Sequence, residues 1–347
     1  MLSPMFSILL VPFLVAMFLA INMGGSGTSP SFSAAYGSNI IRKDLIPGLF
    51  GLFVFFGAII GGKKVVLTIG KGILPGEVMG ITLTTIILLS VCLSILMANL
   101  LRIPQSTSQA TVFALIGPAI YFDILKTHKL FFEIIPTWLI LPFVSFGITV
   151  IIGKFVWGPI NERGKIKFEQ ISNHPSLKII VILASCYVAF AIGSNNVANV
   201  SGPIASMVFN ELDIGTNGEN PLLIMILSVL LITPCFGIGS SLFGQRVVQT
   251  TGKEITEIGP LGAILISVVT ATLLLLASVI KGIPTSLVQL NTAAIIGLGI
   301  GKTNRRGVSF VCTATIKKLL TVWVIAPLIA LGLSFMFTVI ANKVGLL

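Results

Sequence analysis

Charged residues are scarce in this sequence. Asp, Glu, Lys and Arg together make up 10% of its 347 residues, against about 25% in typical soluble domains. A soluble chain of this length needs more charge to cover its surface, so a soluble enzyme and a disordered protein are excluded. Hydrophobic residues make up 55% of the chain, and the mean hydropathy is +1.05. The net charge of +11 fits membrane loops rich in Lys and Arg, so no nucleic-acid partner is expected.

Groups that could hold a metal or perform acid–base chemistry are also few. The eleven acidic residues all lie outside the middle of long apolar stretches, and both histidines, His128 and His174, lie in charged linkers. The four cysteines are widely spaced, without CxxC or HExxH patterns. A disulfide framework or a zinc site is therefore not predicted. The cysteines are expected to be buried, and no cofactor is expected.

Long apolar stretches dominate what is present. Ten stretches of 18 or more residues contain no Asp, Glu, Lys or Arg. About 20 apolar residues cross the hydrocarbon core as a helix, and these stretches are too long for barrel strands. The ten stretches are 1–41, 45–62, 78–101, 103–122, 134–153, 179–210, 220–245, 258–280, 282–301 and 319–342.

The stretches fall into two sets of five. Residues 1–20 lack the basic segment of a signal peptide, so they are interpreted as a retained first membrane helix. The chain is divided into an N-terminal repeat (1–153), a charged linker (154–178) and a C-terminal repeat (179–347). The linker is expected to be cytoplasmic because it carries five Lys and Arg residues. A multi-pass protein of the plasma (inner) membrane is predicted, and a homodimer stays open as an assembly.

The two halves resemble each other in sequence. Residues 62–71 (GKKVVLTIGK) and 244–253 (GQRVVQTTGK) agree at six of ten positions, 182 residues apart. Residues 103–109 (IPQSTSQ) match 283–289 (IPTSLVQ) at a distance of 180. A third pair begins at Ile21 and Ile192. Because the matches keep their order, they indicate an internal duplication.

Duplicated halves of this size are typical of secondary transporters with inverted repeats. Stretch 1–41 would be roughly 60 Å long as one helix, about twice the thickness of the hydrocarbon core. Stretches 1–41 and 179–210 are therefore each expected to be broken. The predicted fold is an all-α polytopic membrane protein with two duplicated, inverted repeats containing broken and re-entrant helices.

Polar residues gather where these two stretches are expected to break. Residues 21–31 read INMGGSGTSPS, and residues 192–203 read IGSNNVANVSGP. Interrupted helices at corresponding positions of two halves indicate a transport site, where freed N–H groups attract anions. The alternative is that small residues only let helices pack closely.

A second polar pair follows in each half. Pro104 and Pro284 are placed at helix starts, where the missing N–H of proline costs nothing. Ser106, Thr107, Ser108 and Gln109 follow in the first half, and Thr285, Ser286 and Gln289 in the second. Ordinary capping explains one hydroxyl but not a whole polar turn, so we expect these groups to donate hydrogen bonds to an oxyanion.

The segment Gly193-Ser-Asn-Asn-Val-Ala-Asn199 resembles the G-A-N-D-V-A-N signature of the inorganic phosphate transporter family, and residues 104–107 resemble its P-x-S-T-T-H motif. The resemblance covers nearly the whole chain. It implies inverted repeats with the substrate near the membrane midplane, and transport of phosphate with sodium or protons.

Several residues depart from the family pattern. The signature Asp is Asn196 in the second repeat and Gly27 in the first, where Ser26 takes the place of the first Asn. Gln109 and Gln289 replace the motif's His. This pattern is similar to the short bacterial sulfate-permease branch of the family.

The loss of both carboxylates favours sulfate as substrate. Sulfate is a full dianion that only accepts hydrogen bonds, and a neighbouring carboxylate would repel it. Hydrogen phosphate gains from an acceptor and stays the alternative. The expected anion ligands are Ser26, Thr28, Ser29, Ser106, Thr107, Ser108, Gln109, Asn195, Asn196, Asn199, Thr285, Ser286 and Gln289. Sodium near Asn22, Asn195 and Asn196 is one hypothesis for coupling, although neither sodium nor protons is assigned as the coupling ion.

Three other classes compete with a carrier. A channel needs a continuous pore, usually from symmetric subunits. An intramembrane hydrolase needs a base or metal beside its nucleophile, and no His, Asp or Glu lies near the Ser-rich turns in sequence. A sensor that lost transport would not be expected to keep both polar turns.

Overall fold

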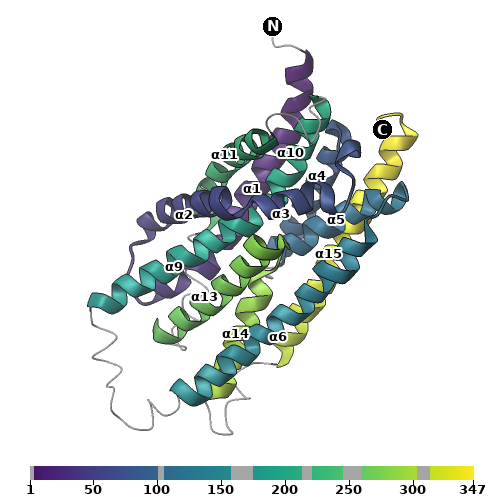
Figure 1. The fold of residues 1–347 in the computed structure, drawn as a ribbon. Helices are drawn as coiled ribbons and strands as arrows, with labels where there is room; N and C mark the ends of the chain where they lie inside the picture. The colour runs from purple at the N-terminus through teal and green to yellow at the C-terminus, as the bar shows by residue number, and fades with distance from the viewer. Residues whose placement is uncertain (1–3, 101–104, 158–174, 213–220, 245–259, 303–312) are drawn as a thin grey trace.

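The computed structural model describes residues 4–100, 105–157, 175–212, 221–244, 260–302 and 313–347, and throughout these ranges the regular elements are helices (Figure 1). The first half contains α1 (Pro4–Gly37), η1 (Lys43–Leu45), α2 (Ile46–Gly61), α3 (Lys63–Leu67), η2 (Thr68–Gly72), η3 (Gly76–Val78), α4 (Ile81–Leu100), α5 (Thr107–Tyr121), η4 (Lys129–Ile134), α6 (Ile135–Ile152) and η5 (Gly153–Trp157). The second half contains α9 (Pro175–Asn196), α10 (Ala198–Glu211), α11 (Pro221–Gly239), η6 (Ser240–Gly244), α13 (Pro260–Leu275), η7 (Leu276–Lys281), α14 (Leu287–Lys302) and α15 (Thr313–Lys343).

Each of the ten apolar stretches forms helix, which confirms the prediction of an all-helical membrane protein. In the described ranges, eight helical spans are long and apolar enough to cross a membrane. Large apolar side chains on their outer faces are exposed, such as Phe132 at 73% and Phe143 at 75%. An exposed apolar surface of this kind is suited to lipid rather than water.

Two short helices, α5 and α14, occupy corresponding positions in the two halves. α5 has 15 residues and α14 has 16 residues. At 1.5 Å per residue each is roughly 24 Å long or less, which is shorter than the ~30 Å hydrocarbon core. Neither helix is therefore long enough to cross the hydrocarbon core by itself.

The predicted break in stretch 1–41 is wrong. α1 runs without interruption for 34 residues, with Pro12 and Pro30 inside it. The hydroxyls that were expected to mark a break instead bond to carbonyls of their own helix, as Thr28 does to Gly24 O (2.7 Å) and Ser31 to Gly27 O (3.1 Å). Membrane helices tolerate Gly and Pro because such local bonds satisfy the backbone.

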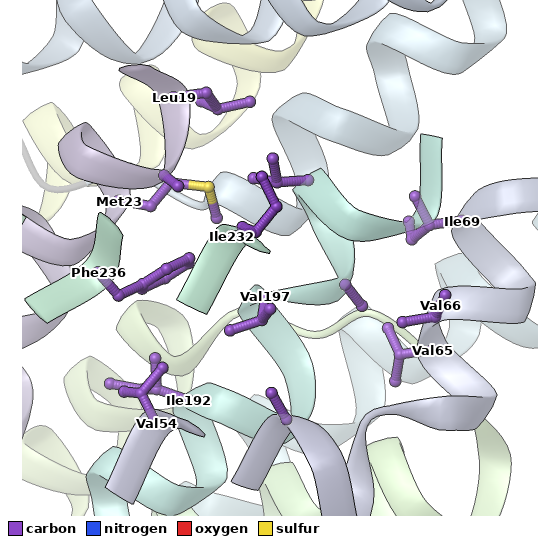
Figure 2. Close-up of a cluster of buried hydrophobic side chains, with 14 of the residues drawn as sticks. Leu19, Met23, Val54, Val65, Val66, Ile69, Ile192, Val197, Ile232 and Phe236 are labelled. Atoms are coloured by element: carbon purple, nitrogen blue, oxygen red, sulfur yellow. The ribbon is translucent and has the colours of Figure 1, made fainter. Parts of the chain in front are cut away.

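Stretch 179–210 is interrupted at a single residue. Val197 separates α9 from α10, and its dihedral angles (φ −60°, ψ −34°) are helical. The side chain of Val197 is buried in the apolar cluster of Figure 2, among residues such as Ile192, Ile232 and Phe236. Half-helix N-termini were expected at residues 22–31 and 193–203. Only the second range contains a helix start, at the junction of α9 and α10.

The main helix crossings come in matched pairs. α1 packs against α11, and α9 packs against α2. A Cβ added to Gly24 would lie 2.2 Å from Phe236 O, and one added to Gly193 would lie 2.1 Å from Val54 O. Phe236 and Val54 are 182 residues apart, the distance already found for the segments 62–71 and 244–253. Equivalent glycines thus allow equivalent backbone contacts in the two halves.

The remaining long helices form two units that each mix both halves. α5 packs against α15 and α4, whereas α14 packs against α6 and α13. We call α4, α5 and α15 the α5 unit, and α6, α13 and α14 the α14 unit. Exchanging the halves converts one unit into the other, as duplication predicts. Inversion of the second half stays a prediction.

Candidate functional site

The first turns of α5 and α14 are built in the same way. Ser106 has extended backbone angles (φ −81°, ψ 107°), and its Oγ accepts a hydrogen bond from Gln109 N at 3.2 Å. In α14, Ser286 Oγ accepts from Gln289 N at 3.3 Å. A Ser that is followed three residues later by Gln is a sequence signal for such a cap. The two polar turns are therefore confirmed as helix starts.

The two glutamines join these helix starts. In a complete capping box, the Gln side chain would return to the N–H of its own capping residue. Here Gln109 Nε2 donates to Gln289 Oε1 (3.3 Å), and Gln289 Nε2 donates to Gln109 Oε1 (3.2 Å). The reciprocal pair brings together the N-terminal turns of two helices that are 180 residues apart in sequence.

Several backbone donors at these helix starts have no acceptor among the described residues. Among the described residues, the N–H groups of Thr107 and Ser108 in α5, and of Leu287 and Val288 in α14, have no acceptor. Thr107 and Ser108 are 9% and 1% exposed. A helix N-terminus combines free N–H groups with the positive end of the helix dipole, which favours an anion.

Asn195 links α9 to both helix starts. Its Oδ1 accepts from Ser108 Oγ and from Thr285 N, each at 3.1 Å. Its Nδ2 donates to Ser278 Oγ (2.8 Å) and to Ile283 O (3.2 Å). An asparagine side chain has two donor hydrogens and two acceptor lone pairs. Asn195 therefore uses its full capacity within the protein and holds the site together in this conformation.

Two asparagine oxygens on either side of the α9–α10 junction are buried and lack partners among the described residues. Asn199 Nδ2 donates to Ser108 Oγ at 3.1 Å, but Asn199 Oδ1 has no hydrogen bond among the described residues. Asn196 Oδ1 is likewise unpaired. A buried acceptor without a partner is costly. These two oxygens therefore suit water, a cation or a substrate that carries a proton.

The segment before α14 has no regular secondary structure. Gly282 takes a left-handed conformation (φ 66°), and Pro284 lies three residues ahead of α14 rather than in its first turn. Trp138 Nε1 donates to Pro284 O at 2.7 Å. The placement of Pro284 at the helix start is therefore wrong, because Ser286 takes the capping position. Pro104 lies outside the described residues.

The polar side chains of α1 are not hydrogen-bonded to this network in the described part of the chain. Ser26 Oγ donates to Met23 O (3.0 Å), and Ser29 pairs with Ser33 (3.0 Å). Thr28 lies against Gly244 of η6. The role of Ser26, Thr28 and Ser29 as anion ligands stays a prediction.

The sodium hypothesis also stays a prediction, with a narrower choice of ligands. Asn22 Nδ2 donates to Phe18 O at 2.9 Å within α1. Both lone pairs of Asn195 Oδ1 are occupied. Of the three suggested residues, Asn196 is the one whose buried oxygen is unpaired.

Ser278 and Trp138 belong to this network but were not predicted from the sequence. Ser278 ends an apolar stretch, and nothing in its surroundings distinguishes it from serines that bond only to their own helix. Trp138 lies on α6, in the other half of the chain from the carbonyl that it contacts. Cross-half contacts of this kind leave no local signal in the sequence.

These features define a multi-pass integral membrane protein in which two helix N-termini meet at the Gln109–Gln289 pair. A model of the phosphate transporter family matches residues 23–165 and 160–334. The chain therefore belongs to the phosphate transporter family and is a permease, as its resemblance to that family predicted.

Individual relatives agree with this assignment. The chain is 33% identical to the sulfate permease CysP of Bacillus subtilis over 94% of its own length and 86% of that protein. It is 25% identical to the putative phosphate permease TK2061 of Thermococcus kodakarensis, over 96% of this chain and 97% of that protein. A solved structure titled "The sodium-dependent phosphate transporter" has the same fold, with a TM-score of 0.79, 22% identity, and coverage of 97% of this chain and 99% of that chain.

Proposed function

We propose that this permease carries a tetrahedral oxyanion through the space between the first turns of α5 and α14, with sulfate favoured over phosphate. The observation that carries the proposal is the meeting of two buried helix N-termini at the Gln109–Gln289 pair. Two helix dipoles and several N–H groups that have no acceptor among the described residues act on the same small region. Such an arrangement stabilises negative charge without needing a charged side chain.

The donor groups at this site favour sulfate. The side chains around the two turns are amides and hydroxyls: Ser106, Thr107, Ser108, Gln109, Thr285, Ser286 and Gln289. A fully ionised dianion needs donors alone. A carboxylate at about 4 Å would repel each unit of its charge by roughly 4 kcal/mol at an effective dielectric of 20. The relative with 33% identity is named a sulfate permease, which supports the same choice.

Phosphate stays the second candidate because of a specific feature. The unpaired Asn196 Oδ1 and Asn199 Oδ1 can accept hydrogen bonds. Hydrogen phosphate carries a proton that it can donate, whereas sulfate does not. Relatives named phosphate permeases also cover almost the whole chain.

We further infer that transport uses alternating access between inverted repeats. The α5 and α14 units are exchanged when the two halves are exchanged, so movement of one unit has a counterpart in the other. Sodium coupling would use Asn196 Oδ1 and Asn199 Oδ1, because asparagine and backbone oxygens are ligands that hard cations accept. We also propose that the protein forms a homodimer and lies in the plasma membrane.

An intramembrane enzyme is not supported by the surroundings of the Ser-rich turns. The described hydrogen-bond partners of Ser106 and Ser108 are a backbone N–H and the amides of Asn195 and Asn199. A serine nucleophile requires a base that takes its proton. We therefore propose that these serines bind and position an anion rather than react.

Uptake into proteoliposomes tests the proposal. Labelled sulfate and labelled phosphate would each be offered with sodium or with a large organic cation, and protein-free vesicles would serve as the control. We expect sulfate uptake that saturates. Unlabelled sulfate should inhibit this uptake, and phosphate should not. Sodium-dependent phosphate uptake without sulfate uptake would assign phosphate. Uptake that never saturates would contradict a carrier.

A further inference from the structure

We propose that the Gln109–Gln289 amide pair is a latch between the α5 unit and the α14 unit, and that the transported anion displaces it once in each cycle. The inference rests on the proposed function and deepens it. The amide pair is the contact that closes the site, and anion binding is the event that opens it.

The pair connects two bodies that also touch where the rings of Phe113 (α5) and Trp138 (α6) stack, with 6.3 Å between their centroids. In the described part of the chain, α5 and α14 are not one of the closely packed helix pairs, whereas each packs extensively within its own unit. Gln109 is 7% exposed and Gln289 is half-buried, so the hydrogen bonds of the pair are partly shielded from solvent. The two hydrogen bonds of the pair, at 3.3 and 3.2 Å, therefore join the two units through side chains.

The hydrogen-bonding groups of the pair suit an anion site before the anion binds. A side-chain amide has two N–H donors and one carbonyl oxygen. In the closed pair, each carbonyl oxygen accepts the partner's N–H, and each amide keeps a second N–H that this pairing does not use. The oxygens that would repel an anion are occupied, while donors stay available.

An arriving oxyanion competes for the donors that hold the latch closed. Its negative oxygens can accept Gln109 Nε2–H and Gln289 Nε2–H in place of the two amide oxygens. Hydrogen bonds to a charged acceptor are roughly twice as strong as those between neutral groups. The exchange therefore favours the anion, and breaking the pair removes one of the links that, with the bridge through Asn195, hold the two units in this conformation.

A double-mutant cycle tests whether the glutamines act as one pair. Gln109→Asn and Gln289→Asn keep the amide but shorten its reach by one methylene group. Because the anion no longer has to displace a partner amide, each single variant is expected to lower the KM for sulfate about threefold or more. The double variant should match the single variants, since either change already breaks the pair. A KM that rises, or effects that multiply in the double variant, would overturn the latch.

Cross-linking tests whether the pair must open. The protein would carry Gln109→Cys and Gln289→Cys, with its four natural cysteines replaced by serine. Two glutamines end to end are longer than two cysteines, and a direct disulfide tolerates Cα atoms only up to about 7 Å apart. A bifunctional methanethiosulfonate with a two-carbon spacer is therefore used, with methyl methanethiosulfonate as the matched control on the same protein.

Cross-linked protein is expected to lose uptake at least about tenfold relative to the same protein modified by the control reagent, and a thiol reductant should restore it. Equal uptake in the two preparations would overturn the proposal. The proposal would also be overturned if both cysteines react with the control reagent but the bifunctional reagent cannot bridge them. If unmodified wild-type protein takes up neither anion, the proposed function fails. If wild-type protein takes up sulfate and the cross-link has no effect, only the latch fails.

Discussion

Asn195 Oδ1 lies 3.1 Å from the backbone N of Thr285 and accepts its hydrogen bond. Asn195 belongs to α9, and Thr285 belongs to the irregular segment before α14. The same oxygen of Asn195 also accepts a hydrogen bond from Ser108 Oγ of α5. One side chain thus sets the positions of both helix starts. This explains how a site made of short polar side chains can be ordered without any charged ligand.

Replacing Asn195 by Asp is expected to destabilise the protein strongly. The change removes both donors to Ser278 and Ile283 and places negative charge against the Ile283 carbonyl. Each lost buried partner costs about 1–3 kcal/mol. Thermal unfolding of the purified protein in detergent measures the effect. Asn196→Asp is the matched control, because Asn196 Oδ1 is unpaired. Equal losses of Tm in the two variants would contradict the role assigned to Asn195.

Ser106→Asp separates helix capping from anion binding. Aspartate caps a helix as well as serine does, so α5 should keep its start, while burial of the carboxylate at a position only 2% exposed should lower Tm. Its negative charge beside the site should also reduce sulfate uptake by about tenfold or more through repulsion. Ser106→Ala, which loses the cap, should cost about 1 kcal/mol of stability and reduce uptake. Unchanged uptake in Ser106→Asp would place the anion elsewhere.

Asn196→Ala should reduce uptake while the protein still inserts in the membrane. The change removes an unpaired buried oxygen and no described hydrogen bond, so little stability is lost. Initial uptake rates with and without sodium would be compared with wild type. A sodium response that disappears in this variant would support a cation at Asn196. Normal uptake under both conditions would remove Asn196 from the candidate site.

Gly24→Ala is expected to disrupt the crossing of α1 and α11. The added methyl group would lie 2.2 Å from Phe236 O, and backbone on both sides prevents an easy shift. Overpacking of this kind typically costs about 1–3 kcal/mol. Gly48→Ala is the control, because nothing lies within 4 Å of the added atom. A lower Tm for Gly24→Ala alone would confirm the close crossing, and equal values would contradict it.

The sequence predicted the parts of the molecule that depend on composition and local pattern. Ten charge-free stretches became helices because apolar length alone decides which segments lipid accepts. The Ser-x-x-Gln patterns at Ser106 and Ser286 identified two helix starts, since capping is a local interaction. The repeated segments and the polar motif around Asn195 were sufficient to indicate the family.

Only the tertiary structure decided which polar groups act together. The continuity of α1 was not predictable, because Gly, Ser and Pro serve equally in a broken helix and in a close helix crossing. The choice depends on Phe236, more than 200 residues away. The saturation of Asn195 and the pairing of Gln109 with Gln289 likewise join distant segments. Hydrogen bonds form wherever donors and acceptors are brought within about 3 Å, and the packing of the whole chain determines that distance.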